Sequence, residues 1–418
     1  MNRRRYLALV GAAASAMAGG CAARGGSDTG ADPTTATTTR TEVTTATTTR
    51  TESNDGSDSP ATGYTVETVA EGFSHPWALC FLPDDAGLLV TERAGRLALV
   101  DRESGDVTRV SGTPTVFARG QGGMLDVALH PRYPDEPWVY LTYSLAGAGR
   151  SSTTAVGRGR LDVVNAQLRG FERLHAAEPF VESAGHYGSR LAFDADERLY
   201  VTVGDRQFKN FGPDHTAQDL TTEHGAVLRF EADGSVPSDN PFVDDSDARA
   251  TVFSYGHRNP QGLTVHPVTG DLWESEYGER DGDELNVLTA GANYGWPIAD
   301  EGCTYGSGSP IGVSHDDRDD VVAPAYTWPC GSGGFPPGGM TFCSGRAFPE
   351  WEGQLFVGGL ASRALGRFTV DGRTATPAER LLTDRGWRVR TVTEAPDTGH
   401  LYCAVDAGSA PVVRLRPV

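Results

Sequence analysis

A sixfold repeat of a polar turn followed by a short apolar strand predicts an all-β fold, a six-bladed β-propeller of four-stranded antiparallel blades. Each turn is rich in Pro, Asp and Gly, and each strand-like run centres on one large apolar residue: Leu89, Tyr140, Tyr200, Trp273, Phe356 and Tyr402. Blade repeats span roughly 40–50 residues and lengthen through loop insertions. Apolar runs of helical period are absent after the N-terminus. A β-sandwich with irregular loops is the alternative.

The first 21 residues have the pattern of a signal peptide of the twin-arginine type. Three arginines at 3–5 precede an apolar run at 6–18, which is too short to span a bilayer as a helix. Consecutive arginines indicate the twin-arginine export route. The small residues directly before Cys21 resemble a lipoprotein cleavage site, so we expect lipidation of Cys21. Secretion with an ordinary cleavage site near Cys21 is the alternative.

Residues 22–63 form a Thr-rich segment with almost no large apolar side chains. Such a segment buries too little surface to offset its conformational entropy, so we expect a disordered linker. Residues 64–418 then form the propeller domain. Together these features predict an exported protein on the extracellular face of the cell membrane, attached only through its N-terminal lipid.

The net charge of −19 excludes a nucleic-acid partner, because nucleic-acid binding needs a basic face. Lys209 is the one lysine among 36 Lys and Arg residues. An acidic chain with little lysine is typical of a halophilic protein that stays soluble at high salt. A GC-rich genome that favours arginine codons is the alternative explanation.

The cysteines after residue 21 divide into two groups. Cys80 and Cys403 lie in strand-like apolar runs, where free cysteine behaves as a small hydrophobic residue. Cys303, Cys330 and Cys343 lie in Gly/Pro-rich loops of a chain predicted to be exported, which favours one disulfide among them. The spacing leaves the pairing open and does not predict a structural zinc site.

Eight motifs, in order, resemble the soluble family of PQQ-dependent glucose/sorbosone dehydrogenases, in particular its aldose sugar dehydrogenase branch. They cover the chain from about Tyr64 to the C-terminus and lie at 120–125, 186–191, 200–205, 234–242, 256–262, 275–278, 293–297 and 388–390. The resemblance implies a quinoprotein oxidoreductase that oxidises aldose sugars at the anomeric hydroxyl to lactones. Hydride would pass to pyrroloquinoline quinone (PQQ), and electrons to an external acceptor that the sequence does not identify.

The resemblance assigns three catalytic residues. His186 would act as the general base for the sugar hydroxyl, a task suited to a side chain whose ordinary pKa is near neutrality. Asp205 would hold and orient that histidine. Arg258 would stabilise negative charge on the quinone. Taken alone, a histidine such as His186 is more often a structural loop residue, and a strand cap is the alternative for Asp205.

Cofactor contacts are also implied by the resemblance, at Gln121, Arg258, Asn259, Arg388 and Arg390. Arg388 and Arg390 flank Val389, so on a strand both would face the same side. Where the family carries a cofactor-binding lysine, this chain reads Gly358 to Arg363 without one. Arg363 is the candidate replacement, although its register is shifted.

Ca²⁺ is the metal that the resemblance implies, held by the backbone carbonyls of Gly278 and Glu279. Glu279 stands where the family has proline, so the turn is expected to be less rigid. Side chains of the acidic run Asp281, Asp283 and Glu284 are an alternative calcium site, since hard cations prefer oxygen ligands.

Two other functions fit a propeller of this kind. A calcium-dependent lactonase or hydrolase would need side-chain carboxylates and an asparagine around the metal rather than a group of arginines. A non-catalytic extracellular propeller would bind a partner or a glycan. The presence of His186, Asp205, Arg258 and Arg388 argues against this second alternative.

Overall fold

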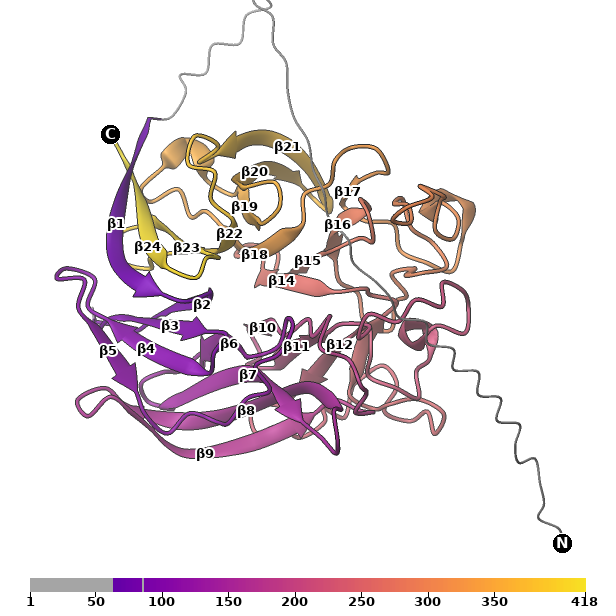
Figure 1. Ribbon diagram of the computed structural model, residues 1–418, viewed down its shortest axis with the longest axis horizontal. Helices are drawn as coiled ribbons and strands as arrows, with labels where there is room; N and C mark the ends of the chain where they lie inside the picture. The colour runs from indigo at the N-terminus through magenta and orange to yellow at the C-terminus, as the bar shows by residue number, and fades with distance from the viewer. Residues whose placement is uncertain (1–62, 85) are drawn as a thin grey trace, which may run out of the picture. The chain divides into compact units, whose positions relative to one another are not determined.

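The computed structural model describes residues 63–84 and 86–418, which form six four-stranded antiparallel sheets arranged as the blades of a ring (Figure 1). The predicted six-bladed propeller is therefore confirmed. The signal peptide, Cys21 and all but the last residue of the Thr-rich linker lie outside the described residues. None of the helical segments in the described part of the chain is long and apolar enough to cross a membrane.

The first three blades follow one another along the chain. Blade 1 contains β2 (Pro76–Phe81), β3 (Leu88–Glu92), β4 (Arg96–Val100) and β5 (Val107–Val110). Blade 2 contains β6 (Met124–Leu129), β7 (Trp138–Ala146), β8 (Ser152–Asp162) and β9 (Gln167–Ala176). Blade 3 contains β10 (Leu191–Phe193), β11 (Leu199–Val203), β12 (Ala226–Phe230) and β13 (Val252–Tyr255).

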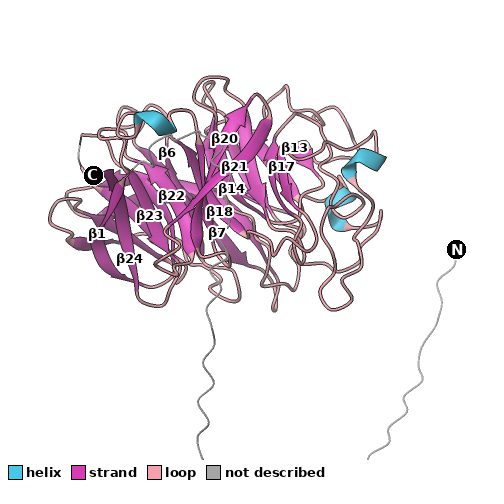
Figure 2. Ribbon diagram, turned by 90° about the horizontal axis from the view of Figure 1, so that it is seen from above, coloured by secondary structure: helices cyan, strands magenta, loops and turns pink. Residues whose placement is uncertain are grey.

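The other three blades complete the ring. Blade 4 contains β14 (Pro260–Val265), β15 (Leu272–Glu276), β16 (Asp283–Val287) and β17 (Tyr326–Trp328). Blade 5 contains β18 (Pro337–Phe342), β19 (Leu355–Gly359), β20 (Ala364–Asp371) and β21 (Thr374–Leu381). Blade 6 contains β22 (Val389–Glu394), β23 (Leu401–Val405), β24 (Ala410–Pro417) and β1 (Tyr64–Phe73). Three short 3₁₀ turns lie in the loops of the described chain, at Thr216–Gln218, His315–Asp317 and Pro349–Trp351 (Figure 2).

Blade 6 closes the ring by joining the two ends of the described chain. β1 pairs antiparallel with β24, with Tyr64 opposite Pro417 and Thr68 opposite Val413. Three strands of this blade come from the C-terminus and its outermost strand comes from the N-terminal end. The pairing ties blade 6 to blade 1, because β1 leads directly into β2.

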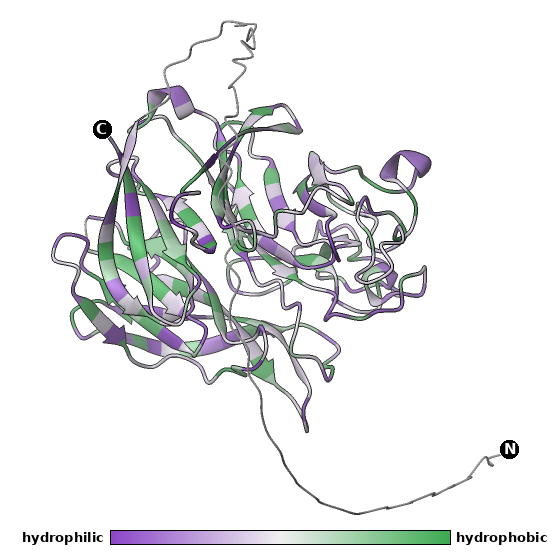
Figure 3. Cartoon of the chain, turned by 45° about the horizontal axis from the view of Figure 1, so that its top comes forward, coloured by the Kyte–Doolittle hydropathy of each residue, from purple (hydrophilic) through white to green (hydrophobic). Residues whose placement is uncertain are grey.

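The six repeated apolar runs are all second strands of their blades, namely β3, β7, β11, β15, β19 and β23. Their central residues are buried because a second strand is paired on both edges and covered on both faces. Outer strands differ: β5 and β21 expose most of their residues, and β9 exposes half. Figure 3 shows hydrophobic and hydrophilic segments alternating along the strands of the ring.

The core lies between neighbouring blades. Leu89 and Leu97 of blade 1 pack in one buried cluster with Val139 and Leu141 of blade 2, and similar clusters join the other blades. The first strands of neighbouring blades contact one another, so they surround the axis of the ring. Residues at one end of these inner strands therefore converge.

Candidate active site

The predicted site residues gather at one end of the ring because of where the inner strands begin. Gln121 precedes β6, His186 precedes β10, Arg258 precedes β14 and Arg388 precedes β22, and each of these is the first strand of its blade. Asp205 follows a second strand, and second strands run antiparallel to first strands. The end of a second strand and the start of a first strand therefore share one edge of the sheet.

His186 and Asp205 form a buried pair. Nδ1 of His186 lies 2.6 Å from Oδ1 of Asp205. The other carboxylate oxygen accepts a hydrogen bond from Nε1 of Trp296 at 2.9 Å, and the Gln207 amide donates to Oδ1 at 2.7 Å. The His186 amide in turn donates to Oε1 of Gln121 at 2.8 Å. These bonds hold the imidazole in one orientation and leave Nε2 as its remaining polar atom.

Burial sets the charge state of this pair. It lowers the pKa of His186 below its usual value and outweighs the opposite effect of the Asp205 carboxylate. Burial alone would raise the pKa of Asp205, but the contacts with His186 and Arg258 lower it. An imidazole that is neutral at neutral pH, beside an ionised carboxylate, is the arrangement expected of a general base.

Arg258 lies close to this pair and is held by several acceptors. Its guanidinium donates to the Tyr277 carbonyl at 3.0 Å and forms an ion pair with Glu279, and it lies 5.1 Å from the centre of the Trp296 ring. Its buried Nε has no partner within the described residues. Asn259 is fully buried: Oδ1 accepts from the Gly188 amide, and Nδ2 has no partner in the same part of the chain.

A cavity of about 330 Å³ lies at the same end of the ring. Five of the six blades contribute to its lining, which is Trp77, Arg93, Gln121, Gln261, Tyr277, Pro336, Leu360, Ala361, Arg388, Arg390 and Asp406. The structure thus brings Gln121, Arg388 and Arg390 together, whereas Arg258 and Asn259 are not among the residues that line this cavity. A larger cavity of about 450 Å³ lies among the opposite ends of β14, β18 and β22 and contains no predicted site residue.

Positive charge dominates the cavity. Arg390 is buried, with NH2 3.0 Å from Oδ2 of Asp406 and NH1 2.8 Å from Oε1 of Gln261, while its Nε has no partner in the described chain. Arg388 is half exposed and lies 3.5 Å from the same Asp406 carboxylate. Burial would raise the pKa of Asp406, but Arg390 and the other contacts lower it to about 2. One ionised carboxylate thus faces Arg93, Arg388 and Arg390, which suits an anionic ligand.

Arg363 is a predicted cofactor contact in the turn between β19 and β20 of blade 5. It is exposed, has a left-handed φ of 51°, and is not among the cavity-lining residues. Leu360 and Ala361, earlier in the same turn, do line the cavity. The structure therefore does not bring Arg363 together with Arg388 and Arg390, and its role as the lysine replacement stays a prediction.

The turn at Gly278 is tightly packed against the backbone that follows it. A Cβ at Gly278 would lie 2.0 Å from the Asp281 carbonyl, so only glycine fits. Within residues 63–84 and 86–418, no protein donor is hydrogen-bonded to the carbonyl oxygens of Gly278 or Glu279. The Glu279 side chain turns instead to Arg258 and Lys209.

Three further carboxylates meet beneath this turn. Glu276, Glu284 and Asp300 line a cavity of about 10 Å³ beside Gly278. Burial and neighbouring carboxylates raise the pKa of Glu284, and burial raises that of Asp300 to about 8. Among Asp281, Asp283 and Glu284, the acidic run that the sequence offers as an alternative calcium site, only Glu284 lines this cavity. Asp283 is bonded to the amides of Gly278 and Phe335, and Asp281 to the amide of Gly331.

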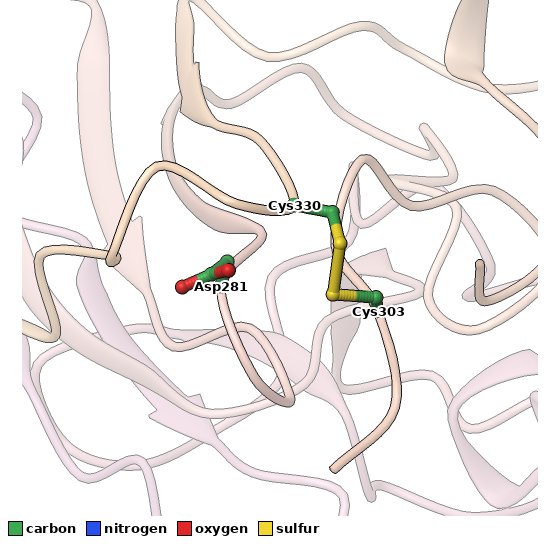
Figure 4. A group of neighbouring side chains, drawn as sticks. All are labelled: Asp281, Cys303 and Cys330. Atoms are coloured by element: carbon green, nitrogen blue, oxygen red, sulfur yellow. A yellow bond between two sulfur atoms is a disulfide. The ribbon is translucent and has the colours of Figure 1, made fainter. Parts of the chain in front are cut away.

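The disulfide joins Cys303 to Cys330, across the loop that packs on blade 4. Figure 4 shows Asp281 beside the two bonded sulfurs. Because both sulfurs are in the disulfide, this group offers no thiolate to a metal. Cys80, Cys343 and Cys403 are free, and the last two are buried.

Several residues of the site were not found from the sequence. Gln261 and Tyr277 lie within the motifs at 256–262 and 275–278, and this membership is the signal that points to them. Asp406 and Arg93 follow second strands, at the edge where the site forms, and that position was their only signal. The Trp296 contact with Asp205 joins residues 91 apart and has no local signal.

Comparison with known proteins places the chain among sugar dehydrogenases. The family model described as Glucose / Sorbosone dehydrogenase matches residues 73–414. Aldose sugar dehydrogenase YliI of Escherichia coli (strain K12) is 38% identical over 366 residues, which are 86% of this chain and 94% of that protein. A crystal structure of a glucose dehydrogenase is 41% identical with a TM-score of 0.78, covering 84% of this chain and 99% of its own. The PQQ-bound aldose sugar dehydrogenase of Streptomyces coelicolor is 28% identical with a TM-score of 0.67, covering 86% and 99%.

Proposed function

The chain belongs to the glucose/sorbosone dehydrogenase family, and from that premise we propose that it is a PQQ-dependent quinoprotein that oxidises aldose sugars at the anomeric hydroxyl to lactones. The observation that carries the proposal is the buried His186–Asp205 pair beside a cavity rich in arginine. This combination supplies a base for a sugar hydroxyl and a cationic site for an anionic cofactor.

PQQ fits the residues present. It is a planar ortho-quinone with three carboxylates, and when bound it supplies an electrophile that accepts a hydride. Arg388 and Arg390 would hold its carboxylates, with Gln121 as a further polar contact. Nε of Arg390 and Nδ2 of Asn259 are buried donors without partners in the described chain, and such donors favour an acceptor-rich ligand. The cavity volume of about 330 Å³ is in the range of small-molecule sites.

His186 performs the proton transfer in this proposal. Nδ1 is engaged with Asp205, so Nε2 takes the proton of the anomeric hydroxyl. Asp205 stabilises the imidazolium that results, and Trp296 and the Gln207 amide keep the carboxylate in place. Arg258 would stabilise negative charge on the cofactor oxygen, because its guanidinium is already held by the Tyr277 carbonyl.

Calcium is the metal we propose. The carbonyls of Gly278 and Glu279 have no protein donor in the described chain, and hard cations take backbone carbonyls readily. The carboxylates of Glu276, Glu284 and Asp300 lie directly beneath and offer a second set of oxygen ligands. The metal would offset the negative charge that these buried groups carry when ionised.

Export and attachment are a separate part of the proposal, and they rest on the sequence. The twin-arginine pattern and Cys21 support an enzyme tethered to the extracellular face by a lipid, with residues 22–63 as a linker. An electron acceptor at the membrane would be within its reach. Mass spectrometry of the mature N-terminus tests this: a diacylglycerol on Cys21 is expected, and an unmodified N-terminus elsewhere would contradict it.

Dye-linked turnover tests the enzymatic proposal. Purified protein loaded with calcium and PQQ is expected to reduce an artificial acceptor dye in the presence of aldoses and to release lactones. Absence of sugar-dependent reduction across a broad aldose panel, with the cofactor shown to be bound, would overturn the proposal. Lactone hydrolysis that needs calcium but not PQQ would instead identify the lactonase alternative.

A further inference from the structure

Arg258, Glu279 and Lys209 form a row of three alternating charges at the mouth of the site. Nζ of Lys209 lies 2.6 Å from Oε1 of Glu279 and also contacts Oε2, and Oε2 is ion-paired with Arg258. The side chains of Glu279 and Arg258 are 6% exposed, whereas that of Lys209 is 50% exposed. The buried carboxylate therefore has one partner inside the site and one at the surface.

This row connects two blades. Lys209 lies in the loop that joins β11 to β12 of blade 3, and Glu279 lies in the loop that joins β15 to β16 of blade 4. The blade 3 loop starts at Asp205, and its Gln207 amide is bonded to the carboxylate that holds His186. Arg206 and Gln207 both have left-handed φ angles, 59° and 67°, which L-residues rarely adopt without support from their surroundings.

The charges of Glu279 and Lys209 also determine how strongly Arg258 can attract an anion in the site. If Glu279 were paired with Arg258 alone, the carboxylate would cancel the positive charge of the guanidinium. A carboxylate shared with a lysine leaves a net positive charge on the group of three, inside a site where the dielectric constant is low. Glu279 without Lys209 would therefore weaken the attraction of Arg258 for an anion.

We propose that Lys209 and Glu279 are positioning residues for Arg258: their ion pair fastens the 206–214 loop across the site, and Lys209 keeps Glu279 from neutralising the guanidinium. The inference rests on the proposed function for the role of Arg258. The fastening of the loop does not depend on any bound cofactor, so it is testable in the cofactor-free protein.

Hydrogen exchange of the cofactor-free full-length chain tests the fastening. The amides of Gln207 and His215 are hydrogen-bonded at the two ends of the loop, to Oδ1 of Asp205 and to the Gly212 carbonyl. Lys209→Ala and Glu279→Gln should each speed their exchange by about fivefold, the effect of losing one partly exposed ion pair. Lys209→Arg should restore the parental rate. The control is Arg198→Ala, which removes the surface ion pair with Asp239 on the same blade.

A double-mutant cycle then separates a coupled pair from two independent effects. The Lys209→Ala/Glu279→Gln double variant should exchange no faster than Glu279→Gln alone, because Glu279→Gln already removes the ion pair with Lys209 together with the ion pair with Arg258. Exchange rates that increase additively in the double variant would overturn the proposed fastening of the 206–214 loop. So would an exchange rate in Lys209→Ala equal to that of the parent, whatever the enzyme's substrate is.

Turnover with saturating PQQ and calcium tests the effect on Arg258. Lys209→Ala should lower kcat by about threefold to tenfold, as expected for one screened charge, and leave the KM for sugar unchanged. Lys209→Arg should recover most of the loss. A rise in KM at constant kcat would overturn the positioning role, because it would show that Lys209 contacts the sugar instead. If the parent has no sugar dehydrogenase activity, the proposed function fails. The hydrogen-exchange experiment still tests whether the Lys209–Glu279 ion pair fastens the 206–214 loop.

Discussion

Nδ1 of His186 lies 2.6 Å from Oδ1 of Asp205, and this contact leaves Nε2 as the imidazole atom available for proton transfer. The pair is 5% and 1% exposed, so its geometry is set by the protein rather than by water. Both residues lie at the end of the ring where the inner strands begin, beside the arginine-lined cavity.

Replacing His186 by alanine should abolish most of the activity and spare the cofactor site. The loss of a general base lowers kcat by about 10²-fold or more. PQQ affinity should stay near the parental value, because His186 is not among the cavity-lining residues. Stopped-flow turnover and calorimetry measure the two quantities. His266→Ala, at the opposite end of β14, is the control; unchanged turnover in His186→Ala would mean that His186 is only a structural loop residue.

The pH dependence should reflect a histidine with a lowered pKa. Burial lowers the pKa of His186, and the base works only when it is neutral. kcat/KM should therefore rise with pH through a value below about 6.5, the ordinary histidine pKa, and stay flat above it. A pH profile of kcat/KM in the loaded enzyme measures this. An acidic limb centred at or above neutrality would contradict the assignment.

Replacing Arg388 should affect the binding of PQQ, whereas replacing Arg258 should affect turnover. Arg388→Ala removes a charge-assisted contact and should weaken PQQ affinity by about tenfold to a hundredfold, with turnover recovering at saturating PQQ. Arg258→Ala should leave turnover impaired even when the site is full. Calorimetric titration followed by turnover at saturation measures both. Arg416→Ala, which alters the surface pair with Glu67, is the control; parental affinity in Arg388→Ala would refute its assignment.

Calcium should stabilise the protein more at alkaline pH than at acidic pH. Burial raises the pKa of Asp300 to about 8, above its ordinary value of 3.8. Because the folded-state pKa is the higher one, the stabilising contribution of Asp300 is complete below the ordinary value and is lost as pH rises through about 8. Bound calcium would offset the ionised carboxylate. The gain in Tm on adding calcium should therefore increase between about pH 5 and about pH 9; an equal gain throughout would contradict this.

The fold was readable from the sequence because each blade repeats one local signal. The six residues that mark the repeats, from Leu89 to Tyr402, all lie in second strands, which are buried along their length and begin with large apolar side chains. The closure of blade 6 by β1 was not predicted. It depends on a pairing between Thr68 and Val413, and no local pattern records such a contact.

The candidate site was only partly readable. His186, Asp205 and Arg258 lie within three of the sequence motifs, and the structure brings these residues together. The ion pairs of Glu279 could not be foreseen, because they depend on how two loops from different blades meet. The pairing of Cys303 with Cys330 rather than Cys343 was open for the same reason: spacing in the sequence does not give the distance between loops.

Anaerobic reduction of the bound cofactor tests most directly whether the protein passes a hydride from an aldose to PQQ with His186 as the base. The protein is loaded with calcium and PQQ, freed of excess quinone, and mixed with an aldose in the absence of any dye. The absorption of the oxidised quinone should disappear rapidly on mixing with sugar, with one equivalent of quinone reduced per bound cofactor. His186→Ala should bind the quinone but lose this rapid reduction. An oxidised spectrum that persists in the loaded parent protein with every aldose would contradict the proposed hydride transfer.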